Sequence, residues 1–195
     1  AGFCNSAGTS NVFLGCCGGY HNLAKANTYV GFKSGFWSSN ADASQNTYVG
    51  YETGLNNTTG AQNTYVGYQA GKDNTDGSGN TSVGHDAQAT GTDSIAIGKT
   101  TTASGTNSIS IGTINDIDND NAVAIGSNTR ADSSTVAIGL DASTNNASAT
   151  SSVVIGVSSY VSAANGVAIG NTASSYSTSK CARVTSIYVS IYVYT

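Results

Sequence analysis

Few side chains in this sequence are of the types that catalysis uses. The 195 residues include two histidines, His21 and His85, and a single glutamate, Glu52. His85 follows a glycine at a position where neighbouring repeats have Tyr68 and Lys99. Such a variable position is typical of the surface rather than of a general base. Serines are abundant, but none stands in a Gly-x-Ser-x-Gly nucleophile elbow. No catalytic site is predicted, and an enzyme is not expected.

The four cysteines, Cys4, Cys16, Cys17 and Cys181, lie close to the two ends of the chain. Cys16-Cys17 followed by His21 has the spacing of no usual zinc motif. One use that stays open is a structural disulfide among the N-terminal cysteines. The other is a cross-link between subunits. A disulfide needs Cα atoms within about 7 Å, so in an extended rod Cys181 would reach an N-terminal cysteine only on a neighbouring copy.

Two further groups of residues could bind an ion or carry a modification. Asp116, Asp118 and Asp120 place three carboxylates at alternate positions, as at the start of a calcium loop, although the expected glycine and closing glutamate are absent. A solvated turn is the alternative interpretation, and no other cofactor is expected. Asn-x-Ser/Thr sequons, which are candidate glycosylation sites, occur at Asn56, Asn57, Asn80 and Asn146.

The composition restricts the class of protein. Only 9% of the residues are charged and the net charge is −4, which argues against nucleic acid as a partner. Hydrophobic residues make up 38% of the chain, but no apolar run reaches the roughly 20 residues of a membrane-spanning helix. Proline is absent. Many Tyr, Ser and Thr residues together with cysteines favour an extracellular or cell-surface location, where disulfides persist.

Elements that would position these side chains are revealed by an internal repeat. Eleven glycines each follow an aliphatic residue, and a β-branched residue lies two places before that aliphatic residue. The spacing from each of these glycines to the next is 16, 19, 17, 17, 14, 14, 14, 13, 17 and 14. The glycines are Gly15, Gly31, Gly50, Gly67, Gly84, Gly98, Gly112, Gly126, Gly139, Gly156 and Gly170.

The repeat predicts an all-β fold, a β-solenoid of about eleven coils. Residues spaced by two lie on one face of a strand, and short strands of this kind build a continuous core only when they stack. We expect the aliphatic residue before each glycine to point inward, and the residue between the β-branched and aliphatic positions to point outward. The predicted core comprises Val49, Val66, Ile97, Ile111, Ile125, Ile138, Ile155 and Ile169.

The chain divides into three parts. Residues 1–90 are aromatic-rich coils of 16–19 residues, residues 91–172 are coils of about 14 residues, and residues 173–195 form a tail. In the tail, Ile187, Val189, Ile191 and Val193 alternate with polar residues and predict a strand. Such an apolar strand invites addition to a second copy of the chain.

The second part resembles the head repeats of trimeric autotransporter adhesins. The segments Ser94-Ile95-Ala96-Ile97-Gly98 and Ser108-Ile109-Ser110-Ile111-Gly112 are close to that family's S-V-A-I-G motif. The first part, with Asn46-Thr47-Tyr48-Val49-Gly50-Tyr51, is similar to N-T-Y-V-G-Y repeats of surface-fibre proteins. The resemblance implies a left-handed parallel β-roll, three chains side by side, and display on a microbial surface.

Two functions remain open, and both have copies of the chain as partners. The first is a structural subunit that self-assembles into an extracellular fibre, secured by the cysteines and the tail strand. The alternative is a trimeric autotransporter-type adhesin head that binds host or matrix ligands. Glycans and matrix material are the further partners considered. A weaker idea is ice or carbohydrate binding by the aligned Thr28, Thr47, Thr64 and Thr81. This threonine column shares its position with Ile95, so we expect it to point inward.

Overall fold

The computed structural model describes residues 1–5, 7–144, 149–176 and 183–184. These residues form strands and turns, with no helix among them. The strands are β1 Val12–Leu14, β2 Thr28–Val30, β3 Thr47–Val49, β4 Thr64–Val66, β5 Thr81–Val83, β6 Gln88–Ala89, β7 Ile95–Lys99, β8 Thr102–Ala103, β9 Ile109–Thr113, β10 Asp116–Ile117, β11 Val123–Ser127, β12 Val136–Ile138, β13 Ser143–Thr144, β14 Val153–Ile155, β15 Tyr160–Val161, β16 Val167–Ile169, β17 Ser174–Ser175 and β18 Arg183–Val184.

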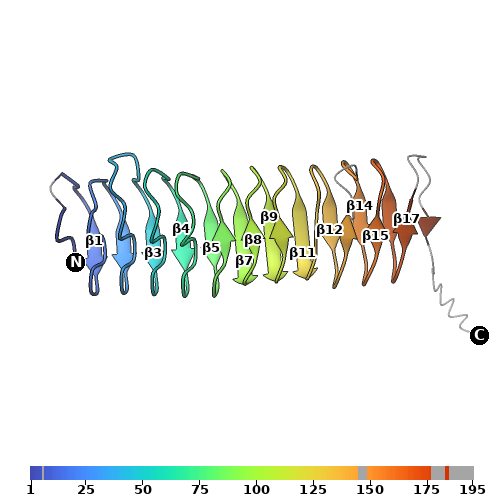
Figure 1. Ribbon diagram of the computed structural model, residues 1–195, viewed down its shortest axis with the longest axis horizontal. Coiled ribbons are helices and arrows are strands. Elements are labelled where there is room, and N and C mark those ends of the chain that lie inside the picture. The colour runs from blue at the N-terminus through green and yellow to red at the C-terminus, as the bar shows by residue number, and fades with distance from the viewer. Residues whose placement is uncertain (6, 145–148, 177–182, 185–195) are drawn as a thin grey trace, which may run out of the picture.

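The predicted β-solenoid of about eleven coils is confirmed. Twelve strands form one parallel sheet in the order β1-β2-β3-β4-β5-β7-β9-β11-β12-β14-β16-β18, which runs the length of the rod (Figure 1). Two three-stranded sheets, β10-β8-β6 and β13-β15-β17, form on another side of the coils in the second half of the chain. The hand of the solenoid stays a prediction.

The glycine-ended segments stack in the register that the repeat predicts. Thr47 pairs with Thr64 and Val49 with Val66 between β3 and β4. At the change of repeat type, β5 pairs with β7 in the same register, so the long sheet continues without a break. Each short strand therefore lies directly on its predecessor, which makes the positions before each glycine into columns along the rod.

The predicted direction of the side chains is wrong. The residue expected to point outward is the one that is buried: Tyr48 and Ala96 are fully buried, while Val49 and Ile97 are 38% and 37% exposed. The predicted core residues Val66, Ile155 and Ile169 are likewise exposed, and Ile111, Ile125 and Ile138 are partly exposed. The actual inward column is Tyr29, Tyr48, Tyr65, Ser82, Ala96, Ser110, Ala124, Ala137, Val154 and Ala168.

The same side of the strands is buried in both halves, but the size of the inward residue differs. The shorter coils of the second half enclose mainly alanine and serine, with larger side chains at a few positions such as Ile117 and Val154, and small side chains fill a small cross-section at native packing density. A period of two shows which residues share a face but not which face is inside. The inward column therefore takes small residues where the coils are short.

The longer coils of the first half enclose a stack of aromatic rings instead. The ring centroids of Phe13 and Tyr29 are 5.3 Å apart, those of Tyr29 and Tyr48 are 4.9 Å apart, and those of Tyr48 and Tyr65 are 4.8 Å apart. Burial raises the pKa of Tyr29, Tyr48 and Tyr65 above the ordinary value for tyrosine. The three core hydroxyls are therefore neutral at physiological pH.

A column of buried asparagines closes the coils of the first half. The N–H of Asn46 donates to Oδ1 of Asn27, and the N–H of Asn63 donates to Oδ1 of Asn46, both at 2.8 Å. Nδ2 of Asn46 donates to the carbonyls of Ala43 and Gly60, each at 2.9 Å. The side chain of Asn46 thus satisfies three backbone groups at the corner before the strand, which explains its burial.

Candidate interaction surfaces

The outward side of the long sheet forms a continuous surface, which we call the aliphatic face. It consists of two side-chain columns that follow the rungs from β1 to β16. The column before the glycines is Leu14, Val30, Val49, Val66, Val83, Ile97, Ile111, Ile125, Ile138, Ile155 and Ile169. The column two places earlier is Val12, Thr28, Thr47, Thr64, Thr81, Ile95, Ile109, Val123, Val136, Val153 and Val167.

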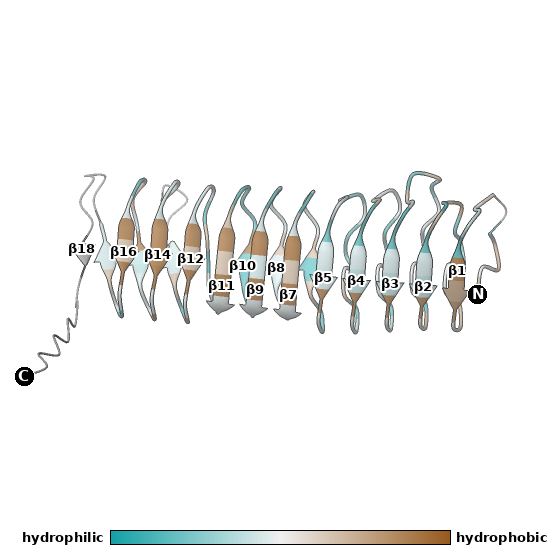
Figure 2. Ribbon diagram, turned by 180° about the vertical axis from the view of Figure 1, so that it is seen from behind, coloured by the Kyte–Doolittle hydropathy of each residue, from teal (hydrophilic) through white to brown (hydrophobic). Residues whose placement is uncertain are grey.

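Hydropathy differs along the aliphatic face. The threonines Thr28, Thr47, Thr64 and Thr81 point outward, against the expectation that they belong to the core. From Ile95 onward the same column is aliphatic, and Figure 2 shows strands β7 to β16 as more hydrophobic than β2 to β5 (Figure 2). The face is thus half apolar in the first half of the rod and wholly apolar in the second.

A column of exposed aromatic rings borders the aliphatic face, one residue after the glycines. Phe32 and Tyr51 stack with centroids 5.1 Å apart, Tyr51 and Tyr68 at 5.1 Å, and Tyr68 and His85 at 4.9 Å. His85 Nδ1 also lies 3.0 Å from a carboxylate oxygen of Asp86. His85 is therefore part of a surface ladder, in agreement with its expected surface position.

At the end of each strand of the long sheet from β1 to β16 the backbone turns through residues with positive φ angles. These turns position the residues of the ladder. Gly112, for example, has a φ of 138°, and a side chain there would collide with the carbonyl of Gly126 in the next coil. Only glycine is compatible with both conditions. The second residue after the glycine is also left-handed, as at Glu52 with a φ of 52°.

The three described cysteines are free thiols. Cys4 and Cys16 are exposed, and the Sγ atoms of Cys16 and Cys17 lie 3.3 Å apart. A hydrogen bond from Cys16 raises the pKa of the Cys17 thiol. Cys181 and the predicted tail strand, Ile187, Val189, Ile191 and Val193, lie outside the described residues. The cross-link between subunits and strand addition by the tail stay predictions.

The structure does not bring the candidate calcium ligands together. Asp116 and Asp118 flank the buried Ile117 and are exposed, and an oxygen of Asp120 accepts the N–H of Thr106 at 2.7 Å. Across the described part of the chain, no three Asp, Glu, His or Cys side chains gather as a metal site would require. The calcium prediction is therefore wrong, since Asp116 lies in β10 and Asp118 and Asp120 lie exposed in the segment that follows it.

Two of the four sequons are part of the core. Asn57 is fully buried and donates to the hydroxyl of Tyr48 at 2.6 Å, and Asn80 is 1% exposed. An oligosaccharide cannot be attached to either amide in the folded chain. Asn56 is partly exposed, which leaves it accessible, and Asn146 lies outside the described residues.

Sequence reasoning missed three sets of residues. The buried asparagine column and the exposed aromatic ladder were visible only as changes of residue type at fixed repeat positions. The third set is a group of stacked rings near the start of the chain, Phe3, Tyr20, His21, Phe36 and Trp37. The ladder's signal was the recurrence of Phe32, Tyr51 and Tyr68 one place after the glycine. Because the strands were expected with the wrong side inward, this recurrence was not connected with a surface beside them.

Comparison with known proteins agrees with the resemblance noted in the second half of the chain. The model of the YadA head domain repeat matches residues 81–101, 89–113 and 147–173. These segments are similar to adhesin-type head repeats, and they contain β5 to β9 and β14 to β16. No curated protein matches the chain significantly. In the part of the chain that the structure describes, no helix is long and apolar enough to cross a membrane.

Proposed function

We propose that this chain is a head segment of an adhesin-type protein on a bacterial surface, in which three copies associate side by side through the aliphatic face. The observation that carries this proposal is the unbroken double column of outward β-branched and aliphatic side chains. Solvent-exposed apolar surfaces of this extent mark interfaces. The face follows every rung from β1 to β16.

The chemistry of the face supports association with an identical surface. Lys99, at the end of β7, is the one charged residue in the long-sheet strands from β1 to β16. Burial of apolar area contributes roughly 25 cal/mol per Å², so many partly exposed valines and isoleucines make association favourable. Identical spacing of the rungs lets copies pack with their columns in register.

The likeness to YadA head repeats supports the number of copies and the location. The resemblance to trimeric adhesin heads implies three chains side by side, and β7, β9, β14 and β16 of the matched segments lie where the aliphatic face is wholly apolar. Adhesion, rather than catalysis, is the activity that such heads supply.

Measurement of mass in solution tests the proposal. Light scattering on the purified chain should give about three times the 19.5 kDa of one chain. Replacement of Ile97 and Ile125 by aspartate should yield a monomer with the same β-type circular dichroism, because charge is costly in an apolar interface. Thr100→Asp is the matched control, since this exposed corner position holds Asp86 and Asp141 in other coils.

Two results would overturn the proposed assembly. One is a monomer at micromolar concentration, which would leave the aliphatic face without a partner in copies of this chain. The other is long fibres in electron micrographs that disappear on reduction or in a Cys181→Ser chain. Fibres of that kind would favour end-to-end assembly through the cysteines and the tail.

A further inference from the structure

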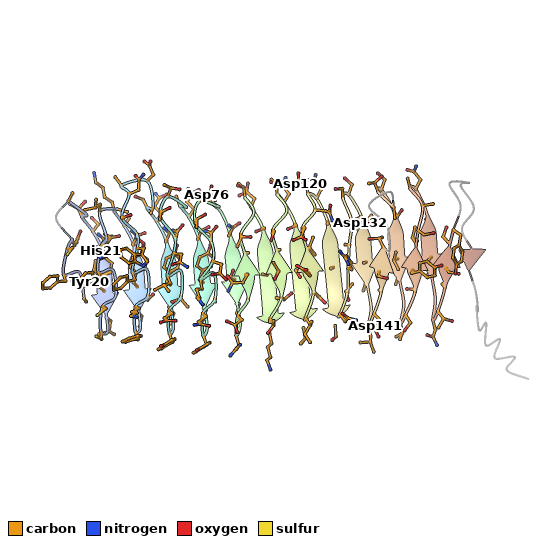
Figure 3. The ribbon with its side chains drawn as sticks, in the orientation of Figure 1. Tyr20, His21, Asp76, Asp120, Asp132 and Asp141 are labelled. Carbon is orange, nitrogen blue, oxygen red and sulfur yellow. The ribbon has the colours of Figure 1, made fainter. Side chains whose placement is uncertain are left out.

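An aromatic patch lies on the first two coils, on the side away from the aliphatic face. Phe3, Tyr20 and Phe36 stack in one column with centroids 5.3 and 5.0 Å apart and nearly parallel planes. His21 and Trp37 stack beside it at 4.5 Å. The rings of the two columns cross at 75° and 79°, which gives a herringbone arrangement (Figure 3 labels Tyr20 and His21).

Back-wall glycines fix the position of this patch. A side chain at Gly19 or Gly35 would collide with the ring of Phe13 or Tyr29, because these core rings reach from the long sheet to the opposite wall of the coil. The patch residues that follow the two glycines therefore lie outside that wall. In the trimer that we propose above, on which the accessibility of the patch in part rests, this side faces outward.

Stacking within the patch leaves its end rings, Phe3 and Trp37, exposed. Trp37 is 45% exposed although His21 covers one face of its indole. The backbone N–H of Trp37 donates to the carbonyl of Leu55 at 3.1 Å. The next coil therefore has Leu55 and Asn56 at the positions that Phe36 and Trp37 occupy in this coil. The herringbone stops there, which leaves Trp37 as the terminal ring of its column.

A polar loop follows the terminal ring in the chain. The interval between Gly31 and Gly50 is the longest in the repeat, and its extra residues include an exposed loop, 39–42, that begins two positions after Trp37. Within the loop, Oδ1 of Asn40 accepts the N–H of Asp42 at 3.0 Å. The loop thus carries an amide and a carboxylate, from Asn40 and Asp42, a few residues after Trp37 in the chain.

One ion pair lies at the rim of the patch. Nζ of Lys33 lies 6.0 Å from the ring centroid of Phe36 and 3.8 Å from a carboxylate oxygen of Glu52. This pair neutralises itself at the rim, and the loop adds the carboxylate of Asp42, so the patch offers no net positive charge to an anion. Most of the exposed aliphatic side chains, which a protein partner would also contact, lie on the opposite side of the rod, in the aliphatic face.

We propose that the aromatic patch binds a neutral saccharide built from β-linked glucose or N-acetylglucosamine units. Such pyranoses present flat C–H surfaces that pack on indole and phenyl rings, and their equatorial hydroxyls reach outward to polar groups. Ligand sites combine apolar ring surfaces with a few placed polar groups in this way. Trp37 supplies the ring surface, and Asn40 and Asp42 supply the polar groups.

The chain offers a direct reporter, because Trp37 is its one tryptophan. Titration with cellohexaose or chitohexaose should change the tryptophan emission in a saturable way. Sorbitol, which has hydroxyls but no pyranose ring, should not. Calorimetry on Trp37→Ala should show at least about a tenfold loss of affinity. Tyr68→Ala is the matched control, since this ring is 44% exposed in the ladder on the other side and should leave binding unchanged.

A second variant protects the test against loss of fold. Asn40→Ala with Asp42→Ala changes only the exposed loop, and it should weaken binding several-fold with an unchanged circular dichroism spectrum. Absence of a saturable response to both oligosaccharides would overturn the proposal. So would equal binding by Trp37→Ala, or a change of oligomeric mass in Trp37→Ala, which would make the patch a contact between copies.

Light scattering on the same samples separates this proposal from the proposed trimer. Saccharide binding by a monomer would contradict the proposed trimer and support the proposed saccharide site. A trimer that binds neither oligosaccharide would contradict the proposed saccharide site and support the proposed trimer.

Discussion

The two halves of the rod solve the same packing problem with different side chains. The longer coils of the first half enclose stacked tyrosines and buried asparagines, whereas the shorter coils after Gly84 enclose mostly alanine and serine. The long sheet passes from one half to the other through β5 and β7 without a shift of register. The difference teaches that the circumference of a coil is matched to the volume of its inward residue.

The outer surfaces of the halves differ as well. Outward Thr-x-Val pairs in β2 to β5 become Ile-x-Ile and Val-x-Ile pairs from β7 onward. The exposed aromatic rings change in the opposite sense, since the ladder ends at His85 and the aromatic patch lies on the first two coils. The second half is therefore suited to association with copies, and the first half carries the groups suited to a ligand.

An exchange of inward residues between the halves should have the largest effect. Ala124→Tyr places a ring in a coil that has no room for it, so we expect loss of cooperative folding in the coils after Gly84. Ala124→Ser is the control, because Ser110 occupies the paired position in the preceding coil. Thermal circular dichroism measures both variants. An unchanged melting temperature for Ala124→Tyr would contradict the match between circumference and volume.

The reverse change, Tyr48→Ala, leaves a cavity between two stacked rings. Loss of a buried aromatic side chain costs about 3–5 kcal/mol, which urea unfolding would detect. Tyr48→Phe keeps the stack and loses the hydrogen bond from Asn57, so we expect about 1–2 kcal/mol. Equal losses for the two variants would show that the hydroxyl, and not the ring, stabilises the first half.

Loss of one corner asparagine should have a smaller effect. Asn46→Ala removes the hydrogen bonds of this side chain with backbone groups of Asn63, Ala43 and Gly60, and it leaves the bond from its own N–H to Asn27 intact. We expect a loss of about 2–4 kcal/mol in the free energy of unfolding, measured in urea. Asn11→Ala, in the first rung and only partly buried, should cost less.

Alkaline pH should weaken the first half more than the second. Burial raises the pKa of Tyr29, Tyr48 and Tyr65 in the folded chain, so their stabilising effect is complete below the unfolded value of about 10. It is lost as pH rises from there toward the folded pKa. Urea midpoints measured from pH 8 to 11.5 should fall, and Tyr48→Phe should make the fall shallower. A flat profile would contradict the burial of these hydroxyls.

The sequence predicted the stacked strands, their register and the continuity of the solenoid. It could do so because every coil repeats the same residue types at the same positions, such as the glycine at Gly98 and the aliphatic residue at Ile97. It did not predict which side of each strand is inside, since alternation is symmetrical about the sheet. A usable signal was present: where Tyr48 or Tyr65 gives way to Ala96, the spacing between the glycines decreases from 17 to 14. Only an inward residue would be coupled to coil length in this way.

The candidate sites were less predictable for a related reason. Asn57 and Asn80 fit a sequon, but their role as buried corner residues depends on neighbouring coils. Asp116, Asp118 and Asp120 alternate as ligands would, yet on a strand alternation sends Asp116 and Asp118 to the solvent around a buried Ile117. In a repeat protein, the role of a short motif depends on how the neighbouring coils bury or expose its side chains.

A pair of neighbouring substitutions tests the direction of the strands most directly. Ser110 is fully buried and Ile111 beside it is partly exposed on the aliphatic face. Ser110→Asp should unfold the surrounding coils, because a buried charge without a partner costs several kcal/mol. Ile111→Asp should keep the β-type circular dichroism and lower the mass measured by light scattering. The opposite outcome, a folded Ser110→Asp and an unfolded Ile111→Asp, would place the isoleucines inside and contradict this account.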